Sequence, residues 1–207
     1  MQNPQYIIVM KIGPYCGYSL EEIIDIKQKE EKKIGEFFIG YSGVFCRPKV
    51  VKNLVNHAIN NNSSVKVLFI ETKSSYDNEN SNEFNYFSKD GESWQELSNE
   101  ILLVGDTNKK HFAITGKNLE KINYKLDLTQ YCTLMGMFPN KEQYLDNYLK
   151  YRVDKACGYY LLRNLAEEKI VNISYMCDLV DPYCVHIKKT DLRDTTRNFS
   201  RHLFIAE

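Results

Sequence analysis

Two short runs of apolar residues, 6–12 and 65–70, restrict the folds that this chain can adopt. The second run, VKVLFI, is apolar at almost every position, so a strand built from it would be buried on both faces. Such a strand needs neighbours on both sides and covering layers above and below. We therefore predict a sheet in which 65–70 is a central strand.

The residues after the first run carry the signals of a helix. Ser19 and Glu22 fit a capping box, in which each side chain bonds a free amide of the first turn. Apolar residues then recur at helical spacing up to Gly35, and glycine is common just beyond a helix end. We expect the charged tract 27–33 to be the solvent face of this helix.

A second strand and a second helix follow in the same order. Residues 36–41 have a strand pattern, and Pro48 suits the first position of a helix whose apolar stripe extends to Ile59. The first 73 residues therefore have the order β-α-β-α-β. This order is typical of an α/β layer with some parallel pairing.

Turn signals dominate the middle of the chain. Residues 84–88 and 93–97 flank a glycine-containing turn, which predicts a hairpin. Residues 101–104 and 111–115 flank a second turn of the same kind. Together they predict an antiparallel meander.

The last third is expected to hold a long helix from Lys141 to about Leu165, followed by strands at 169–175 and 183–188 turned at Asp181. The predicted fold class is α+β, with an N-terminal βαβαβ layer, a central antiparallel β-meander, and a long C-terminal helix followed by a β-hairpin. We expect a single compact domain over residues 1–207. The alternative is two lobes, 1–73 and 86–207, joined by the polar loop 74–85.

Charge and cysteine usage limit the classes of partner. The chain has 27 basic and 27 acidic side chains, so its net charge argues against binding to long nucleic acids. No apolar run is long enough for a membrane span, and the start lacks signal-peptide features, so we expect a cytoplasmic protein with reduced thiols. The absence of CxxC and HExxH patterns predicts no metal site, and no cofactor is expected.

The first candidate site is the loop at 40–49, where a strand leads through glycines into a helix start. Free amides at a helix N-terminus favour anions, and two cations lie close by. The candidate ligand-binding residues of this loop are Tyr41, Ser42, Gly43, Arg47 and Lys49. The alternative is that the glycines serve a tight turn and Arg47 points to water. For Cys46, burial as an apolar side chain is favoured over a reactive thiolate.

The second candidate site is a face of the expected helix 141–165. At 100° per residue Arg152 falls within the apolar stripe, between Tyr148 and Tyr159, and Lys155 lies beside it. A cation on a buried face needs a partner, which can be an anionic ligand in a cavity or an internal carboxylate. Both alternatives stay open.

A third segment is assigned to the same site. Tyr15 and Tyr18 belong to the loop after the first strand. If the first two strands are parallel neighbours, this loop and the 40–49 loop leave the same edge of the sheet, where α/β proteins bind ligands.

We therefore expect a non-catalytic binder of a small anionic, nucleotide-like ligand, such as a signalling-nucleotide sensor or a phage-type sequestering protein. The first alternative is a hydrolase or transferase that acts on a phosphorylated substrate, with Cys46, His111 or His186 as catalyst. The second is a tyrosine-rich interaction module or homodimer, since tyrosines make efficient contact residues and the chain has 15 of them.

Overall fold

A computed structural model describes residues 3–43, 45–73, 81–106, 111–134, 144–149, 155–161 and 168–189. Its helices are α1 (Leu20–Ile34), α2 (Pro48–Asn60), α3 (Leu145–Tyr148) and the 3₁₀ helix η1 (Leu128–Gln130). Its strands are β1 (Tyr6–Ile12), β2 (Phe37–Ser42), β3 (Val65–Glu71), β4 (Ser81–Glu83), β5 (Tyr86–Ser88), β6 (Gln95–Glu96), β7 (Val104–Asp106), β8 (His111–Asp127), β9 (Tyr131–Thr133), β10 (Lys155–Tyr160) and β11 (Ile170–Lys188).

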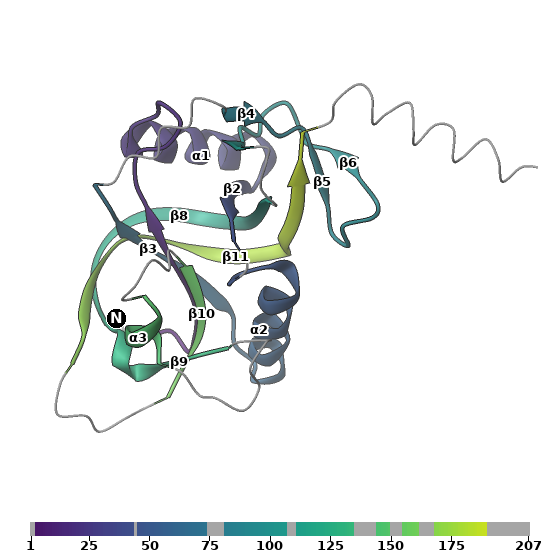
Figure 1. Ribbon diagram of the computed structural model, residues 1–207. Helices are drawn as coiled ribbons and strands as arrows, with labels where there is room; N and C mark the ends of the chain where they lie inside the picture. The colour runs from purple at the N-terminus through teal and green to yellow at the C-terminus, as the bar shows by residue number, and fades with distance from the viewer. Residues whose placement is uncertain are drawn as a thin grey trace, which may run out of the picture.

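A large mixed sheet organises these elements (Figure 1). It has nine strands, seven of them in the order β2-β8-β11-β3-β1-β10-β9, while β5 pairs with β11 and β6 with β5. β4 and β7 form a separate two-stranded sheet. Strand therefore dominates the described structure, and the expected α+β class with a long C-terminal helix is wrong.

The elements of the first 73 residues are those expected from the sequence. The amide of Glu22 donates to Ser19 Oγ at 3.2 Å, and the amide of Ser19 donates to Glu22 Oε2 at 2.8 Å, so the capping box that begins α1 is formed. Gly35 ends α1 with a left-handed φ of 82°, and Pro48 begins α2. Local signals of this kind need no distant partner, which is why they predict these boundaries well.

The pairing of these strands differs from the expectation. β1 and β3 are parallel neighbours, with Tyr6 opposite Val65, and β3 is central and buried as predicted. β2, however, is not next to β1. It lies at the end of the strand order and pairs antiparallel with β8.

Two long strands replace two of the expected hairpins. β8 and β11 pair antiparallel from Ile170↔Asp127 to Ile187↔His111. The expected pairing of 101–104 with 111–115 is wrong, because β7 pairs with β4 while β8 pairs with β2 and β11. The hairpin of β5 and β6 is confirmed.

The closing hairpin is wrong for a related reason. Residues 169–175 and 183–188 fall in one strand, β11, whose register with β8 shifts between Leu179 and Cys184. The chain around Asp181 makes an irregularity in the ladder and does not reverse, because β8 continues alongside it on both sides.

The expected helix 141–165 is also wrong. α3 covers only Leu145–Tyr148, and β10 lies between β1 and β9. A Cβ at Gly158 would lie 2.5 Å from Leu145 Cδ1, so β10 packs closely on α3. Pairing on both edges of β10 overrides the helical spacing of its apolar residues.

The bent sheet carries buried apolar clusters on both faces. α1 and α2 cover the larger cluster, and α3 and η1 cover a second one on the opposite face of β1 and β3 (Figure 1). Ile7 and Ile8 of β1 belong to different clusters, as expected for a strand buried on both faces. A third cluster packs Ala113 of β8 and Val185 and Ile187 of β11 against Leu97 and Leu103. Among the helices described, none is long and apolar enough to cross a membrane.

Candidate functional site

A cavity of about 320 Å³ lies between α1 and the sheet, where β1 and β2 end. This volume is at the lower end of the range for small-molecule sites. Most of its wall is apolar, with isoleucines from β1, α1 and β2 and with Leu103 and Val104 opposite. Its polar contributors come from seven separate segments and are Lys11, Tyr15, Tyr18, Lys27, Tyr41, Ser42, Thr72, His111 and Lys155.

A tight turn after β1 supplies two of these residues. Tyr15 and Tyr18 exchange backbone hydrogen bonds of 3.0 Å across Cys16 and Gly17, whose φ angles are 50° and 81°. Two successive positive φ values are the signature of a type I′ turn, and glycine accepts the second without strain. Because Ser19 caps α1 directly afterwards, the turn is held at the mouth of the cavity.

His111, the first residue of β8, lines the same cavity as Tyr15. A Cβ added to Gly105 would lie 3.1 Å from His111 Cε1 and 3.3 Å from the Tyr15 hydroxyl oxygen, so both side chains pack on the backbone of β7. The His111 ring is buried and lies 4.7 Å from the ring of Phe84, centroid to centroid. The position of His111 in the cavity is therefore fixed by packing.

Lys27 of α1 is a buried cation at the cavity. Its Nζ donates to Glu30 Oε1 at 2.7 Å and to the Leu102 carbonyl at 2.6 Å. Glu30 in turn accepts from the amides of Leu102 and Phe38. Burial lowers the pKa of Lys27, while Glu30 acts in the opposite direction. The expectation that 27–33 is wholly a solvent face is thus wrong for both residues, which are 5% and 1% exposed.

Lys155 supplies a second ammonium group. It is the first residue of β10 and pairs with Met10 of β1, which carries its side chain to the end of β2. Its Nζ donates to the Ser42 carbonyl at 3.0 Å and lies 5.4 Å from the centroid of the Tyr41 ring. A Cβ at Gly43 would lie 4.0 Å from the same Nζ. Lys155, Tyr41, Ser42 and Gly43 therefore meet, although the sequence analysis placed Lys155 in a second candidate site.

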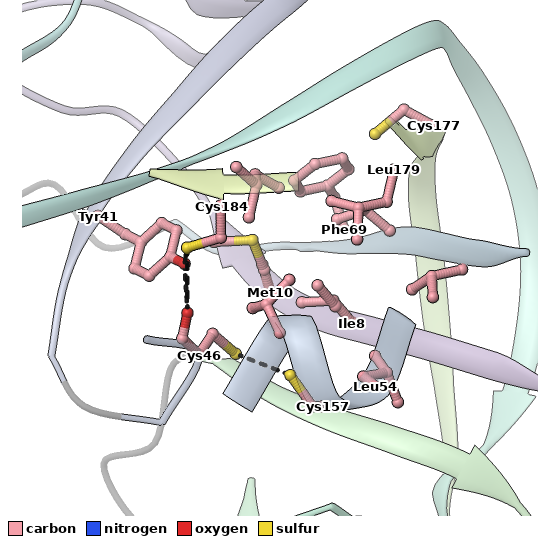
Figure 2. Close-up of a cluster of buried hydrophobic side chains, with 14 of the residues drawn as sticks. Ile8, Met10, Tyr41, Cys46, Leu54, Phe69, Cys157, Cys177, Leu179 and Cys184 are labelled. Atoms are coloured by element: carbon pink, nitrogen blue, oxygen red, sulfur yellow. Dashed lines mark hydrogen bonds between the residues drawn. The ribbon is translucent and has the colours of Figure 1, made fainter. Parts of the chain in front are cut away.

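Tyr41 lines the cavity, and its hydroxyl points toward Cys46 and Cys184 (Figure 2). The hydroxyl donates to the Cys46 carbonyl at 2.5 Å and is 3.1 Å from Cys184 Sγ. Burial, and then the neighbouring thiols of Cys184 and Cys46, raise the pKa of Tyr41 well above its usual value. The phenol is therefore neutral and structural, so Tyr41 offers a stacking surface and no free hydroxyl.

The thiol of Cys46 points toward Cys157 in a cluster of buried side chains (Figure 2). Its Sγ is 3.7 Å from Cys157 Sγ, and both residues are buried. The hydrogen bond to Cys46 and then burial raise the pKa of Cys157, and burial raises the pKa of Cys184 to about 12. The preferred interpretation of Cys46 as a buried apolar side chain agrees with this packing. Among the described residues no group of His, Cys, Asp or Glu has the arrangement of a metal site.

The remaining predicted residues lie elsewhere. Arg47 precedes α2 and does not line the cavity, although its Nε is buried with no hydrogen-bond partner among the described residues. Lys49 is exposed, and Tyr159 packs against the main core. Tyr148 ends α3, and Arg152 falls outside the described residues.

Sequence reasoning missed two parts of the site. We expect Lys27 to face solvent, but it falls on the apolar stripe of α1. Its place on that stripe could have indicated that it is buried. The backbone edge of β2 at Gly40 also lines the cavity, and only the strand order shows that no other described strand pairs with this edge.

Comparison with protein-family models, with curated proteins and with solved structures gives no match to this chain.

Proposed function

We propose that the protein binds a small anionic ligand with an apolar or aromatic body, of the nucleotide type, in the cavity between α1, β1, β2 and β10. The proposal is for binding without turnover, as a sensor or a sequestering protein would require. The supporting observation is the composition of the wall. Lysine and histidine side chains line it, whereas no carboxylate is among the described residues that do so.

The two lysines contribute differently. Lys155 places its ammonium beside Tyr41 and Ser42 at one end of the β2 segment. Lys27 is paired with Glu30, but a protonated amine has three donors and the described structure uses two of them. The third is available to an acceptor in the cavity. Lys11 also borders the cavity, but the alternation of side chains along β1 places it on the face opposite Met10 and Lys155.

The apolar wall selects the other part of the ligand. Ile23 and Ile26 of α1 and Ile39 of β2 line the cavity, and Tyr15 and Tyr18 add aromatic rings to its lining. Burial of an aromatic ring among such residues supplies affinity that an inorganic anion cannot gain. A ligand with one anionic end and one planar end therefore uses the whole cavity.

The direct test is thermal denaturation of the full chain with AMP, GMP, CMP, UMP and cyclic AMP, with adenosine as the neutral control. A ligand at a hundred times its Kd stabilises by about 2.7 kcal/mol, which corresponds to a rise in Tm of roughly 5–10 °C for a chain of this size. We expect at least one nucleotide to produce such a shift and adenosine to produce a much smaller one. No shift with any nucleotide would overturn the proposal.

A pair of variants locates the binding. Lys155→Gln removes the ammonium at the cavity, and loss of a charged hydrogen bond weakens binding by about tenfold or more. Lys49→Gln removes the same charge from an exposed residue outside the cavity and serves as the matched control. Equal weakening by the two variants would contradict a site at Lys155.

Turnover is the second candidate, and one observation favours it. Of the three suggested catalysts, His111 lines the cavity, whereas Cys46 and His186 do not. Mass spectrometry of the nucleotides after long incubation separates the two functions. Unchanged nucleotide supports simple binding. A product that forms with the wild type and does not form with His111→Gln supports catalysis.

A further inference from the structure

The cavity borders a strand edge whose backbone is open. β2 is at the end of the strand order, and among the described residues it pairs on one side only, with β8. In an antiparallel ladder, alternate residues direct their N–H and C=O groups to the partner strand, and the others direct both groups away from it. The open edge of β2 is therefore formed by every second residue.

Two side-chain contacts identify which residues form this edge. The amide of Phe38 donates to Glu30 Oε2 at 3.2 Å, and the carbonyl of Ser42 accepts from Lys155 Nζ at 3.0 Å. Both groups are thus directed away from β8. By the same alternation, the N–H and C=O of Gly40, midway between them, also point away from β8.

Gly40 lines the cavity and is exposed, whereas Phe37 and Phe38, earlier in β2, are buried. A Cβ at this position would lie 3.3 Å from Leu103 Cδ2, so the side-chain direction is occupied by packing, whereas no described strand pairs with the outward peptide groups. Lys27 with Glu30 bounds this edge at Phe38, and Lys155 bounds it at Ser42. At Gly40 the edge therefore presents one donor and one acceptor, between the contacts of the two lysines.

From this geometry we infer that Gly40 is a recognition element for a nucleobase. A ligand group with a donor next to an acceptor, as on the hydrogen-bonding edge of a base, pairs with the N–H and C=O of Gly40 while its phosphate contacts Lys155. This inference rests on the proposed function and narrows it, because a phosphate or a fatty acid lacks such an edge. Backbone groups read only the pattern of donor and acceptor, so several bases satisfy it.

The ligand test compares AMP with ribose 5-phosphate and with N6,N6-dimethyl-AMP by isothermal titration of the wild-type chain. Loss of one typical hydrogen bond lowers affinity about 5- to 10-fold, and loss of the whole base lowers it further. We expect AMP to bind most tightly, the dimethyl compound about 5- to 10-fold less tightly, and ribose 5-phosphate least. If all three bind equally, the anion site stands and the base-recognition inference falls. If none of the three binds and no nucleotide of the thermal test shifts the Tm, the proposed function itself fails.

The protein test uses Gly40→Pro and Gly40→Ala. Proline removes the outward N–H of an edge strand, a place where it is tolerated, and alanine adds a similar Cβ while keeping the N–H. We expect Gly40→Pro to weaken AMP by about 5- to 10-fold relative to Gly40→Ala, with the affinity for ribose 5-phosphate equal in the two variants. Equal AMP affinity in the two variants would overturn the inference. If Gly40→Pro does not fold, the ligand series in the wild type decides it.

Discussion

The Nζ of Lys155 donates a 3.0 Å hydrogen bond to the carbonyl oxygen of Ser42, although the two residues are 113 positions apart in the chain. The bond ties the start of β10 to the open edge of β2. Lys155 owes its position to β1, since it pairs with Met10. The cavity therefore depends on three segments that meet only when the sheet has formed.

Gly158→Ala distinguishes the strand β10 from a helix over the same residues. In an exposed helix this change would stabilise the protein by about 1 kcal/mol. In the structure a Cβ would lie 2.5 Å from Leu145 Cδ1 and 3.3 Å from the Cys132 carbonyl, so we expect destabilisation of about 1–3 kcal/mol in urea unfolding. Leu145→Ala in the same chain should make the alanine less unfavourable. A stabilising Gly158→Ala would contradict the packing of β10 on α3.

The start of α1 could be predicted from the sequence, whereas β10 could not. The start of α1 was predicted because Ser19 and Glu22 bond each other within one turn. β10 was missed because its hydrogen bonds go to β1 and β9, far away in sequence. Spacing within the segment carries no information about such partners.

In the candidate site too, the residue types could be predicted from the sequence, whereas the strand order that brings them together could not. Tyr15, Ser42 and Lys155 are candidate ligand-binding residues from different segments, and all three line one cavity. The sequence analysis places the two loops at one sheet edge by making the first two strands parallel neighbours. This pairing is wrong, because β3, β11 and β8 lie between β1 and β2. The residue types of a binding site can be recognised within a short stretch of sequence. The order of the strands cannot, because it depends on pairing between distant segments.

Lys27→Met should strongly destabilise the fold. It leaves the buried carboxylate of Glu30 without its cation, and breaking a buried ion pair costs about 3–5 kcal/mol. Urea unfolding measures this change. The control is Lys29→Met, which breaks an exposed pair with Asp25 in the same helix and should cost less than about 1 kcal/mol. Similar losses for the two variants would contradict the structural role of Lys27.

The thiols should differ sharply in reactivity. Cys16 in the turn is partly exposed, whereas Cys46, Cys157 and Cys184 are buried. We expect iodoacetamide at pH 8 to modify Cys16 first and to modify the three buried thiols only after unfolding, as measured by peptide mass. Cys16→Ser should remove the fast phase among these four residues. Rapid labelling of native Cys46 would instead favour a reactive thiol.

The turn between β5 and β6 should be sensitive to acid. Asp90 accepts hydrogen bonds from the amides of Ser93 and Glu92 and from Ser88 Oγ, and these bonds hold its pKa well below the usual 3.8. Since the folded pKa is the lower one, this stabilisation is present above 3.8 and is lost as the pH falls through the folded pKa.

An NMR titration of the Asp90 carboxyl carbon measures this shift. We expect a pKa below 3.8 in the wild type and a higher value in Ser88→Ala, which lacks one of the three donors. A wild-type Asp90 that titrates at 3.8 or above would show that the turn does not hold the carboxylate in this way.

The location of ligand binding is tested most directly by an amide NMR titration of the full chain with AMP. The proposed site predicts shifts that saturate together at Gly40, Ser42 and Gly43 and at the Tyr15–Tyr18 turn, with little change around Lys49. Lys155→Gln should weaken all of these shifts by about tenfold or more. No shift at millimolar AMP, or shifts confined to the start of α2, would contradict a nucleotide site in this cavity.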